Sequence, residues 1–395
     1  MRGSVPLRLP RHAVGVVSDQ VGPVNSAAEP GRLCSWQAAA RLLVRGAPLC
    51  KLGRMPDRHA LLTGSTGFLA SHLLPALLAD GWKVRACGRR TRPDRFPDEV
   101  DYRSVDLAEP DQLGGLYDGV THLFHLAGAS SSTSTDEEMH RFNVVTTRNL
   151  LAAAPPGLER ALYMSSTSVY GEEVQLPVPV REDAQPSPSR GYGKAKWESE
   201  QEVWAAAEAG LPVVVLRPVS VFGPGNVKLL GSAVLDTAVE AWAGLDTLAV
   251  HDRPVEQRLV HVEDLVRATL HLAGHDAAVG HAYNVVADEY PSSHEVARVL
   301  AGTFGMTVEL HKDPDGGPAY DERAALHREM LEQGMRPDIL LTEQRFRFMR
   351  KSNRNNRLSI DAVLGTGFRF QHGDLEPAIG RTIDWYRKNR WVLTR

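Results

Sequence analysis

Between residues 59 and 225, short apolar segments alternate with longer segments of helical periodicity. The first pair is HALLTG at residues 59–64, followed by GFLASHLLPALLADG at residues 67–81. Apolar runs of strand length that alternate with helices predict βαβ units, in which the strands are parallel and buried on both faces. We therefore expect an α/β fold built on a Rossmann-type, doubly wound parallel sheet.

The same alternation predicts the order of the elements. Strands are expected at residues 59–64, 83–89, 100–107, 121–128, 160–167 and 211–225, and helices at residues 67–81, 109–119, 136–154 and 189–210. After Gly225 the alternation loosens, and an amphipathic helix at residues 375–389 closes the chain. We therefore expect a Rossmann domain over residues 55–225. A smaller C-terminal α/β lobe over residues 226–395, interleaved with the sheet, would complete a substrate pocket.

The first 54 residues differ from the rest because they are rich in Arg, Pro, Ser and Ala and nearly free of acidic residues. Such a composition predicts a disordered leader, or an extension from an upstream start codon that places the natural beginning at Met55. A transit peptide is a further interpretation of an acid-poor, Arg-rich segment. A second segment, residues 311–357, contains a polar loop at 312–322 and a basic run at 343–357 that we expect to be a solvated helix face.

Overall composition excludes several classes of protein. A formal net charge of -3 provides no general attraction to nucleic acid or to an anionic membrane. No apolar run reaches the about 18 residues of a transmembrane helix. The three cysteines, Cys34, Cys50 and Cys87, are too few and too scattered for a disulfide framework or a zinc site. We therefore expect a cytoplasmic protein without a metal, whose partner is a small-molecule substrate.

The first predicted strand leads into the turn Gly64-x-x-Gly67-x-x-Ala70. Small residues in such a turn let the backbone approach a pyrophosphate, and the N-terminus of the following helix offers free N–H groups and a positive dipole. Ala70 replaces the usual third glycine but still permits close helix–strand packing. The turn therefore predicts a dinucleotide site, with contacts from Gly64, Thr66, Gly67, Phe68 and Leu69.

The end of the second predicted strand bears on the choice of cofactor. An acidic residue there would bind the adenosine ribose of NAD, whereas this chain has Arg89 and Arg90. Arginine can pair with a 2′-phosphate through charge-assisted hydrogen bonds, so we expect NADP, with NAD as the alternative. Asp106 and Leu107, at the end of the third strand, are expected to flank the adenine.

Tyr192 and Lys196 lie four residues apart at the start of a predicted helix, which places them on one helix face. An ammonium nearby favours a phenolate and can orient a nicotinamide ribose. The fifth strand ends in the hydroxyl-rich segment 165–168, at the carboxyl edge of the sheet where ligands bind. These features predict acid–base chemistry by Tyr192 on a substrate oxygen. The polar loop 130–135, which begins with Ser130, is expected to face the substrate.

From residue 58 to residue 388 the chain resembles the extended short-chain dehydrogenase/reductase family, also called the NAD-dependent epimerase/dehydratase family. The matching segments occur in the family's order: LLTGSTGFLASHL, LFHLAG, FNVVTTRNLL, MSSTSVYG, YGKAKWESE, LRPVSVFGPG, LVHVEDLVRA, YNVV and RTIDWYR. The resemblance implies a Ser/Thr-Tyr-Lys site beside bound NAD(P). It also implies a dimer through the helices at residues 134–154 and 190–209.

The resemblance assigns further residues by position. The hydroxyl that orients the substrate falls on Ser166, with Ser165 and Thr167 beside it, and Lys196 is the residue that lowers the pKa of Tyr192. Asn143 matches an asparagine that supports the site. The cofactor is implied to contact Leu126, Ala127, Gly128 and Pro218. Arg258 matches an arginine that grips the diphosphate of nucleotide sugars, or it pairs with Glu263 or Asp264.

Three functions remain open on this basis. The first is an NADP(H)-dependent oxidoreductase acting on a secondary alcohol or carbonyl, with Tyr192 as general acid and base. The second is a nucleotide-sugar epimerase or dehydratase that uses bound NAD(P). The third, a non-catalytic dinucleotide sensor, is disfavoured because a sensor needs no acid–base tyrosine. The arginine pair favours the first, since NADP is the cofactor typical of net reduction.

Overall fold

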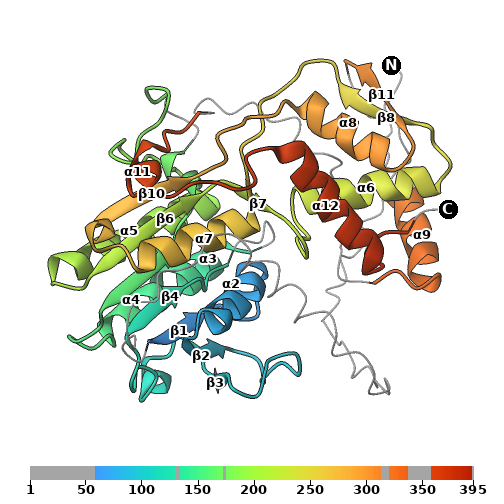
Figure 1. The fold of residues 1–395 in the computed structure, drawn as a ribbon. Helices are drawn as coiled ribbons and strands as arrows, with labels where there is room; N and C mark the ends of the chain where they lie inside the picture. The colour runs from blue at the N-terminus through green and yellow to red at the C-terminus, as the bar shows by residue number, and fades with distance from the viewer. Residues whose placement is uncertain (1–57, 130–133, 172–174, 313–319, 337–356, 394–395) are drawn as a thin grey trace, which may run out of the picture.

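A seven-stranded parallel sheet forms the centre of the molecule in the computed structural model, which describes residues 58–129, 134–171, 175–312, 320–336 and 357–393. The strands lie in the order β3-β2-β1-β4-β5-β6-β10 (Figure 1). Their bounds are β1 His59–Thr63, β2 Lys83–Gly88, β3 Asp101–Ser104, β4 His122–His125, β5 Arg160–Met164, β6 Val213–Pro218 and β10 His281–Val285. The strand order reverses between β1 and β4, which is the switch point where a doubly wound sheet binds its ligand. The predicted Rossmann-type fold is confirmed.

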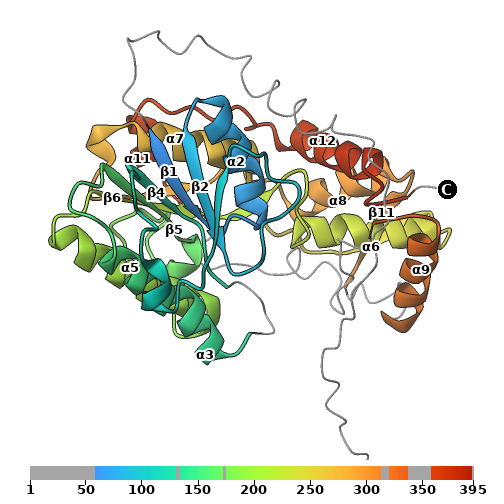
Figure 2. The ribbon, with the colours of Figure 1, turned by 90° about the horizontal axis from the view of Figure 1, so that it is seen from below.

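Helices cover both faces of this sheet. In Figure 2 the sheet lies between α7 (Val262–Ala273) on one side and α5 (Gly191–Glu208) on the other. The first face also carries α2 (Phe68–Ala79), which packs against α7. The predicted helix 136–154 is present as α3 (Asp136–Met139), a π-helical segment η2 (His140–Val145) and α4 (Thr146–Ala152). None of the described helices combines the length and the apolar character that a bilayer span requires.

Some predicted elements are shorter in the structure. The predicted helix 109–119 is reduced to the 3-10 helix η1 (Pro110–Leu113), because Gly114 and Gly115 follow it and Gly115 has a φ of +71°. The predicted strand 211–225 divides into β6 and β7 (Ser220–Phe222). The second part leaves the main sheet and pairs with β9 (Leu259–His261).

The C-terminal lobe has a hydrophobic core of its own. It contains α6 (Leu230–Trp242), β8 (Thr247–His251), α8 (Ser293–Thr303), β11 (Thr307–His311), α9 (Tyr320–Glu332) and α12 (Leu375–Lys388). α6 lies in the part of the chain where the alternation loosens, so the sequence pattern does not predict it. Ten of its thirteen residues are buried, Asp236 and Glu240 among them. α9 begins within the expected polar loop 312–322. It is held by a buried pair in which Arg323 Nη1 lies 2.6 Å from Asp236 Oδ1.

Three elements from the second half of the chain return to the sheet: α7, β10 and α11 (Asp361–Gly365), which contacts β10. A 3-10 helix, η4 (Asp276–Ala278), connects α7 to β10. The expected leader and almost all of the basic run 343–357 lie outside the described residues.

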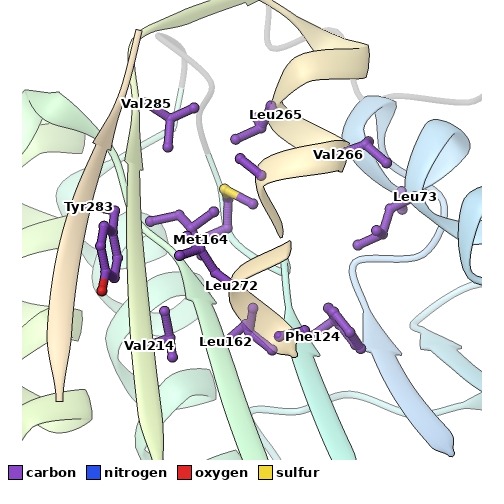
Figure 3. Packing of buried hydrophobic residues seen from close by; sticks show 14 of the residues in the cluster. Leu73, Phe124, Leu162, Met164, Val214, Leu265, Val266, Leu272, Tyr283 and Val285 are labelled. Atoms are coloured by element: carbon purple, nitrogen blue, oxygen red, sulfur yellow. The ribbon is translucent and has the colours of Figure 1, made fainter. Parts of the chain in front are cut away.

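The core between the sheet and its first face is built from aliphatic and aromatic side chains. Figure 3 shows Leu73 of α2 facing Val266 of α7, above Phe124 of β4 and Leu162 of β5. Leu73 is 1% exposed. This packing fixes α2, and therefore the glycine turn that precedes it, against the sheet.

Leu73→Ala is expected to lower the free energy of unfolding by about 2–5 kcal/mol, because it leaves a cavity between α2 and α7. Denaturant titration followed by circular dichroism measures this change. Leu78→Ala, on the same helix at a half-buried position, serves as the control and should have a smaller effect. Equal effects of the two substitutions would contradict the proposed role of Leu73 in the core.

Candidate functional site

The glycine turn is held against the end of β4. Gly64 has a φ of +63°, and a Cβ at this position would lie 2.8 Å from the Ala127 nitrogen and 2.9 Å from the Leu126 carbonyl carbon. Any side chain would therefore collide with backbone, in a conformation that already favours glycine. The structure thus brings together Gly64, Leu126 and Ala127, three of the residues predicted to contact the cofactor.

Thr63 fixes this crossing. Its hydroxyl oxygen accepts hydrogen bonds from the backbone nitrogens of Leu126 (3.2 Å) and Ala127 (3.1 Å) and lies 2.8 Å from His125 Nδ1. On the other side of His125, Nε2 lies 2.9 Å from the Thr147 hydroxyl, which donates to the Asn143 carbonyl. Burial and then the charge of Lys196 lower the pKa of His125 to about 3, so the ring is neutral. A polar chain therefore links the turn to the helix that carries Asn143.

The N-terminus of α2 presents free backbone N–H groups beside the turn. Gly67 is its N-cap, without a side-chain cap, and no acidic residue occupies the first turn. These groups begin with Phe68 and Leu69, as expected, and Thr66 is exposed next to them. Ala70 is 1% exposed and packs inward, which agrees with its expected packing role. The arrangement fits an anion such as a pyrophosphate.

Three arginines gather at the adenosine end of the site. Arg89 and Arg90 are exposed after β2, and the Arg89 guanidinium lies 4.3 Å from the centroid of the Phe142 ring. Arg95, which the sequence analysis missed, donates to the Thr66 carbonyl across 3.3 Å. No strand ending signals Arg95, because it lies in the loop after β2.

The two other residues predicted near the adenine, Asp106 and Leu107, lie just after β3, which ends at Ser104 rather than at residue 107. The carboxylate of Asp106 accepts a hydrogen bond from Arg141 Nη2 across 3.1 Å, so it already has a cationic partner. The side chain of Leu107 is buried in the core on that side of the sheet.

The structure brings together Ser166, Tyr192 and Lys196. Ser166 follows β5 and caps the 3-10 helix η3 (Thr167–Tyr170), since its hydroxyl accepts a hydrogen bond from the Ser168 nitrogen across 3.2 Å. A Cβ on Gly193 would lie 2.5 Å from the Ser168 carbonyl oxygen. Only glycine therefore lets α5 approach η3 so closely, and this approach brings Tyr192 near Ser166, whose hydroxyl acts on the pKa of the phenol.

The Lys196 ammonium is buried beneath Tyr192. Nζ donates to the Met164 carbonyl across 2.8 Å and to the Tyr163 hydroxyl across 3.4 Å, and it lies 6.0 Å from the centroid of the Tyr192 ring. Burial lowers the pKa of Lys196 to about 8, against an opposing effect of the Glu200 carboxylate. At neutral pH the lysine therefore remains mostly charged.

Tyr192 differs from the expected phenolate. Burial raises its pKa to about 12, and the hydrogen bond with Ser166 lowers it only in part. Lys196 does not contribute to this pKa shift, because its ammonium is directed at Met164 and Tyr163 rather than at the Tyr192 oxygen. The phenol is therefore protonated at neutral pH, as a general acid requires before it gives a proton to a carbonyl oxygen.

Asn143 lies in the π-helical segment η2, an irregularity that often marks functional positions. Its amide nitrogen donates to the carbonyls of Met139 (2.8 Å) and Ala129 (3.2 Å). Its Oδ1 is buried and has no hydrogen-bond partner among the described residues. A Cβ on Gly128 would lie 2.6 Å from this oxygen and 3.4 Å from Lys196 Nζ. Gly128 is therefore confined between Asn143 and Lys196, which supports the grouping expected of them.

Three other predicted residues, Thr167, Pro218 and Arg258, can be placed relative to the strands. Thr167 is buried, and its hydroxyl donates to the Pro218 carbonyl across 3.4 Å, so it faces β6. Pro218 ends β6 beside it. Arg258 immediately precedes β9, and its charge acts on Tyr290. Ser130 lies outside the described residues.

The two carboxylates that were considered as partners of Arg258 have other contacts. Asp264 lies 2.8 Å from Arg267 Nη1, and Glu263 lies 2.9 Å from His372 Nε2.

Within the described parts of the chain, three residues that could act as metal ligands lie close together: His261, Glu263 and His372. His261 Nδ1 accepts a hydrogen bond from the Glu263 backbone nitrogen, and His372 Nδ1 accepts from the Arg381 guanidinium. In a neutral ring the proton then resides on Nε2, so neither imidazole offers a lone pair toward the group. These side chains form a hydrogen-bonded clasp between α7 and the segment before α12.

Comparison with known proteins agrees with this geometry. A model of the NAD dependent epimerase/dehydratase family matches residues 60–286. GDP-6-deoxy-D-mannose reductase of Pseudomonas aeruginosa is 30% identical over 270 residues, which cover 65% of this chain and 84% of that protein. 2-Alkyl-3-oxoalkanoate reductase of Stenotrophomonas maltophilia is 32% identical over 188 residues, or 43% of this chain. The chain spans about half the length of several such relatives, 53% in this case.

The fold is shared with solved structures as well. The structure of RMD from Pseudomonas aeruginosa complexed with NADPH superposes with a TM-score of 0.62 at 23% identity. The match covers 84% of this chain and 99% of that one.

Gly64→Ala is expected to weaken binding of NADPH at least tenfold, because the new methyl group pushes the turn away from Leu126 and Ala127. Titration of the protein's intrinsic fluorescence with NADPH measures this loss. Gly157→Ala is the matched control, since a Cβ there meets no atom within 4 Å. Unchanged NADPH affinity in Gly64→Ala would show that the turn does not hold the cofactor.

Proposed function

The chain belongs to the NAD-dependent epimerase/dehydratase family, and we propose that it is an NADP(H)-dependent oxidoreductase that interconverts a secondary alcohol and a carbonyl compound. The observation that carries this proposal is the protonated Tyr192 phenol in contact with Ser166 at the carboxyl edge of the sheet. The close approaches at Gly64 and Gly128 fit a dinucleotide lying across the switch point.

In the reductive direction, Ser166 and Tyr192 both bind the substrate's carbonyl oxygen. A nicotinamide held in this crevice would supply the hydride for the carbonyl carbon and leave as oxidised cofactor. Tyr192 donates its proton to the oxygen, so that the product is an alcohol. Lys196 stabilises the phenolate that Tyr192 becomes, since a buried ammonium favours a nearby negative charge. The reverse reaction uses the same groups with Tyr192 as base.

We propose NADP rather than NAD on the basis of Arg89, Arg90 and Arg95. The first two follow β2 and are exposed, and the third contacts the turn through Thr66. The last residue of β2 is Gly88, and the two that follow it are arginines, so this strand end has no carboxylate to accept a ribose hydroxyl. A 2′-phosphate would gain charge-assisted hydrogen bonds from guanidinium groups here.

The second candidate is a nucleotide-sugar epimerase or dehydratase, favoured by the expected role of Arg258 and by the sugar nucleotide in the name of the Pseudomonas relative. The assay that separates the two uses GDP-6-deoxy-D-mannose with NADP⁺, a panel of simple ketones with NADPH, and UDP-glucose with either oxidised cofactor. Net change in the absorbance of reduced nicotinamide supports the oxidoreductase. Conversion of UDP-glucose to its epimer without net absorbance change would replace it with the second candidate.

We propose three further features: a dimer, a reducing compartment and a division into two domains. The described helices α4 and α5 pack against each other, and Arg148 of one lies 2.7 Å from Glu202 of the other. We propose that their outer faces form a homodimer.

The thiol of Cys87 is buried, and burial raises its pKa to about 12, which suits a reducing compartment such as the cytoplasm. The division into a Rossmann domain and a substrate lobe near residue 225 is supported by the separate cores.

Tyr192→Phe is expected to lower kcat by about 10²–10⁴-fold, because the general acid is removed. NADPH affinity should remain unchanged, since the ring is retained. Tyr117→Phe provides the control, because that buried phenol donates to the Leu150 carbonyl away from the site. Steady-state kinetics and fluorescence titration measure the two quantities, and near-normal turnover in Tyr192→Phe would refute its assigned role.

The double substitution Arg89→Ala and Arg90→Ala is expected to weaken NADPH binding about tenfold or more while leaving NADH binding nearly unchanged. The reason is the loss of charge-assisted hydrogen bonds, each worth about 1.5–3 kcal/mol. Thermal stabilisation by each cofactor reports the difference. Arg103→Ala is the control, since this exposed arginine pairs with Asp101. Equal stabilisation of the unmodified protein by NADPH and NADH would remove the arginine argument.

A further inference from the structure

A buried ion pair lies directly behind the catalytic group. Glu200 is 0% exposed and Arg217 is 3% exposed. The guanidinium donates Nε to Glu200 Oε1 across 3.1 Å and Nη2 to Oε2 across 2.6 Å, so the pair is bidentate. The Ser165 hydroxyl also donates to Glu200 Oε1. A carboxylate removed from water in this way is stable only because its oxygens are occupied by these donors.

The pair continues into a polar network that crosses the sheet. Arg217 Nη1 donates to the Tyr170 hydroxyl (3.0 Å) and to the Glu182 carbonyl (2.9 Å). Tyr170 donates to Asn284 Oδ1 across 2.7 Å, and Asn284 lies on β10. One connected set of bonds thus joins the ends of α5, β5, η3, β6 and β10 behind the substrate site.

Glu200 is linked to the catalytic residues in two ways. Its partner Ser165 directly precedes Ser166, so the bond fixes the end of β5 where Ser166 must face Tyr192. Glu200 also lies one helical turn after Lys196, on the same face of α5. The other titratable groups around the ammonium are neutral: His125 on β4, Tyr163 on β5 and Tyr192 on α5.

We propose that Glu200 is a positioning residue for the reaction: its carboxylate, oriented by Arg217, holds the Ser165–Ser166 strand end in place and keeps Lys196 in its ammonium form. This inference rests on the proposed function, because it assigns Glu200 a role in the chemistry of Ser166, Tyr192 and Lys196. The carboxylate acts through these residues and does not itself contact the substrate.

The electrostatic part has a definite sign. Glu200 raises the pKa of Lys196, which burial has lowered to about 8. Replacing the carboxylate by an uncharged amide removes this effect and leaves the Arg217 charge uncompensated nearby, so the Lys196 pKa falls further. The ammonium is then lost at a lower pH. If turnover needs the charged lysine, the alkaline limb of the pH–rate profile therefore moves to a lower pH.

The direct test follows the Lys196 side chain by NMR in protein labelled with ¹³C-lysine, with the signal assigned by its absence in Lys196→Met. The titration midpoint of Lys196 should move down by about one pH unit or more in Glu200→Gln. Glu202→Gln is the matched control on the same helix, where the carboxylate makes a half-exposed pair with Arg148. Its Lys196 midpoint should equal that of the unmodified protein. Equal midpoints in all three proteins would overturn the proposal.

The double substitution Glu200→Leu and Arg217→Met covers the case in which Glu200→Gln does not fold, because replacing both charges avoids an unpaired buried guanidinium. It should show a downward shift that is smaller than in Glu200→Gln, because the Arg217 charge is removed together with the carboxylate. An unshifted midpoint in this folded protein would again overturn the proposal. Since the NMR titration needs no substrate, its outcome is independent of whether the proposed oxidoreductase activity is found. Where turnover is measurable, the alkaline limb of the kcat profile should move with the Lys196 midpoint.

Discussion

The close approach between the glycine turn and the end of β4 is the constraint on which the rest of the site depends. Gly64 has no room for a side chain against Leu126 and Ala127, and Thr63 ties the same two backbone nitrogens to β1. Because β1 and β4 flank the switch point, this crossing sets the floor of the crevice that a dinucleotide would occupy. Hydrogen bonds through His125 and Thr147 then connect Thr63 to Asn143, so the position of the turn is also fixed relative to that helix.

The opposite wall of the crevice is built on a second close approach. Gly193 lets the start of α5 contact η3, and this contact alone brings the Tyr192 phenol to Ser166. Burial then determines the protonation states: the phenol keeps its proton, and the lysine beneath it has a pKa near the upper end of the physiological range. The two glycine contacts therefore act on different sides of one crevice. In the proposed function the first positions backbone for the cofactor, and the second positions an acid for the substrate.

Much of this architecture could be predicted from the sequence. The alternating pattern predicts six of the seven sheet strands, and the spacing of Tyr192 and Lys196 predicts their shared helix face. The pattern fails after Gly225, where the alternation of strand-like and helical segments loosens, so it does not predict α6. It also fails for contacts between distant segments. Arg95 and the Glu200–Arg217 pair have no local signal, because their importance comes from what the fold brings beside them.

The buried ion pair beside the site bears on why the Lys196 ammonium can be so deeply enclosed. A buried pair adds little net stability compared with apolar packing, because desolvation offsets most of the attraction. Its retention here is better explained by what it does to its neighbours. A bidentate pair has a fixed orientation, so Ser165 and the end of β5 are held in one geometry. The negatively charged partner, Glu200, lies on the same face of α5 as Lys196. An apolar replacement would preserve the packing of this region but would leave the ammonium without a compensating charge. The chemistry of the site therefore requires a charge that the stability of the fold does not.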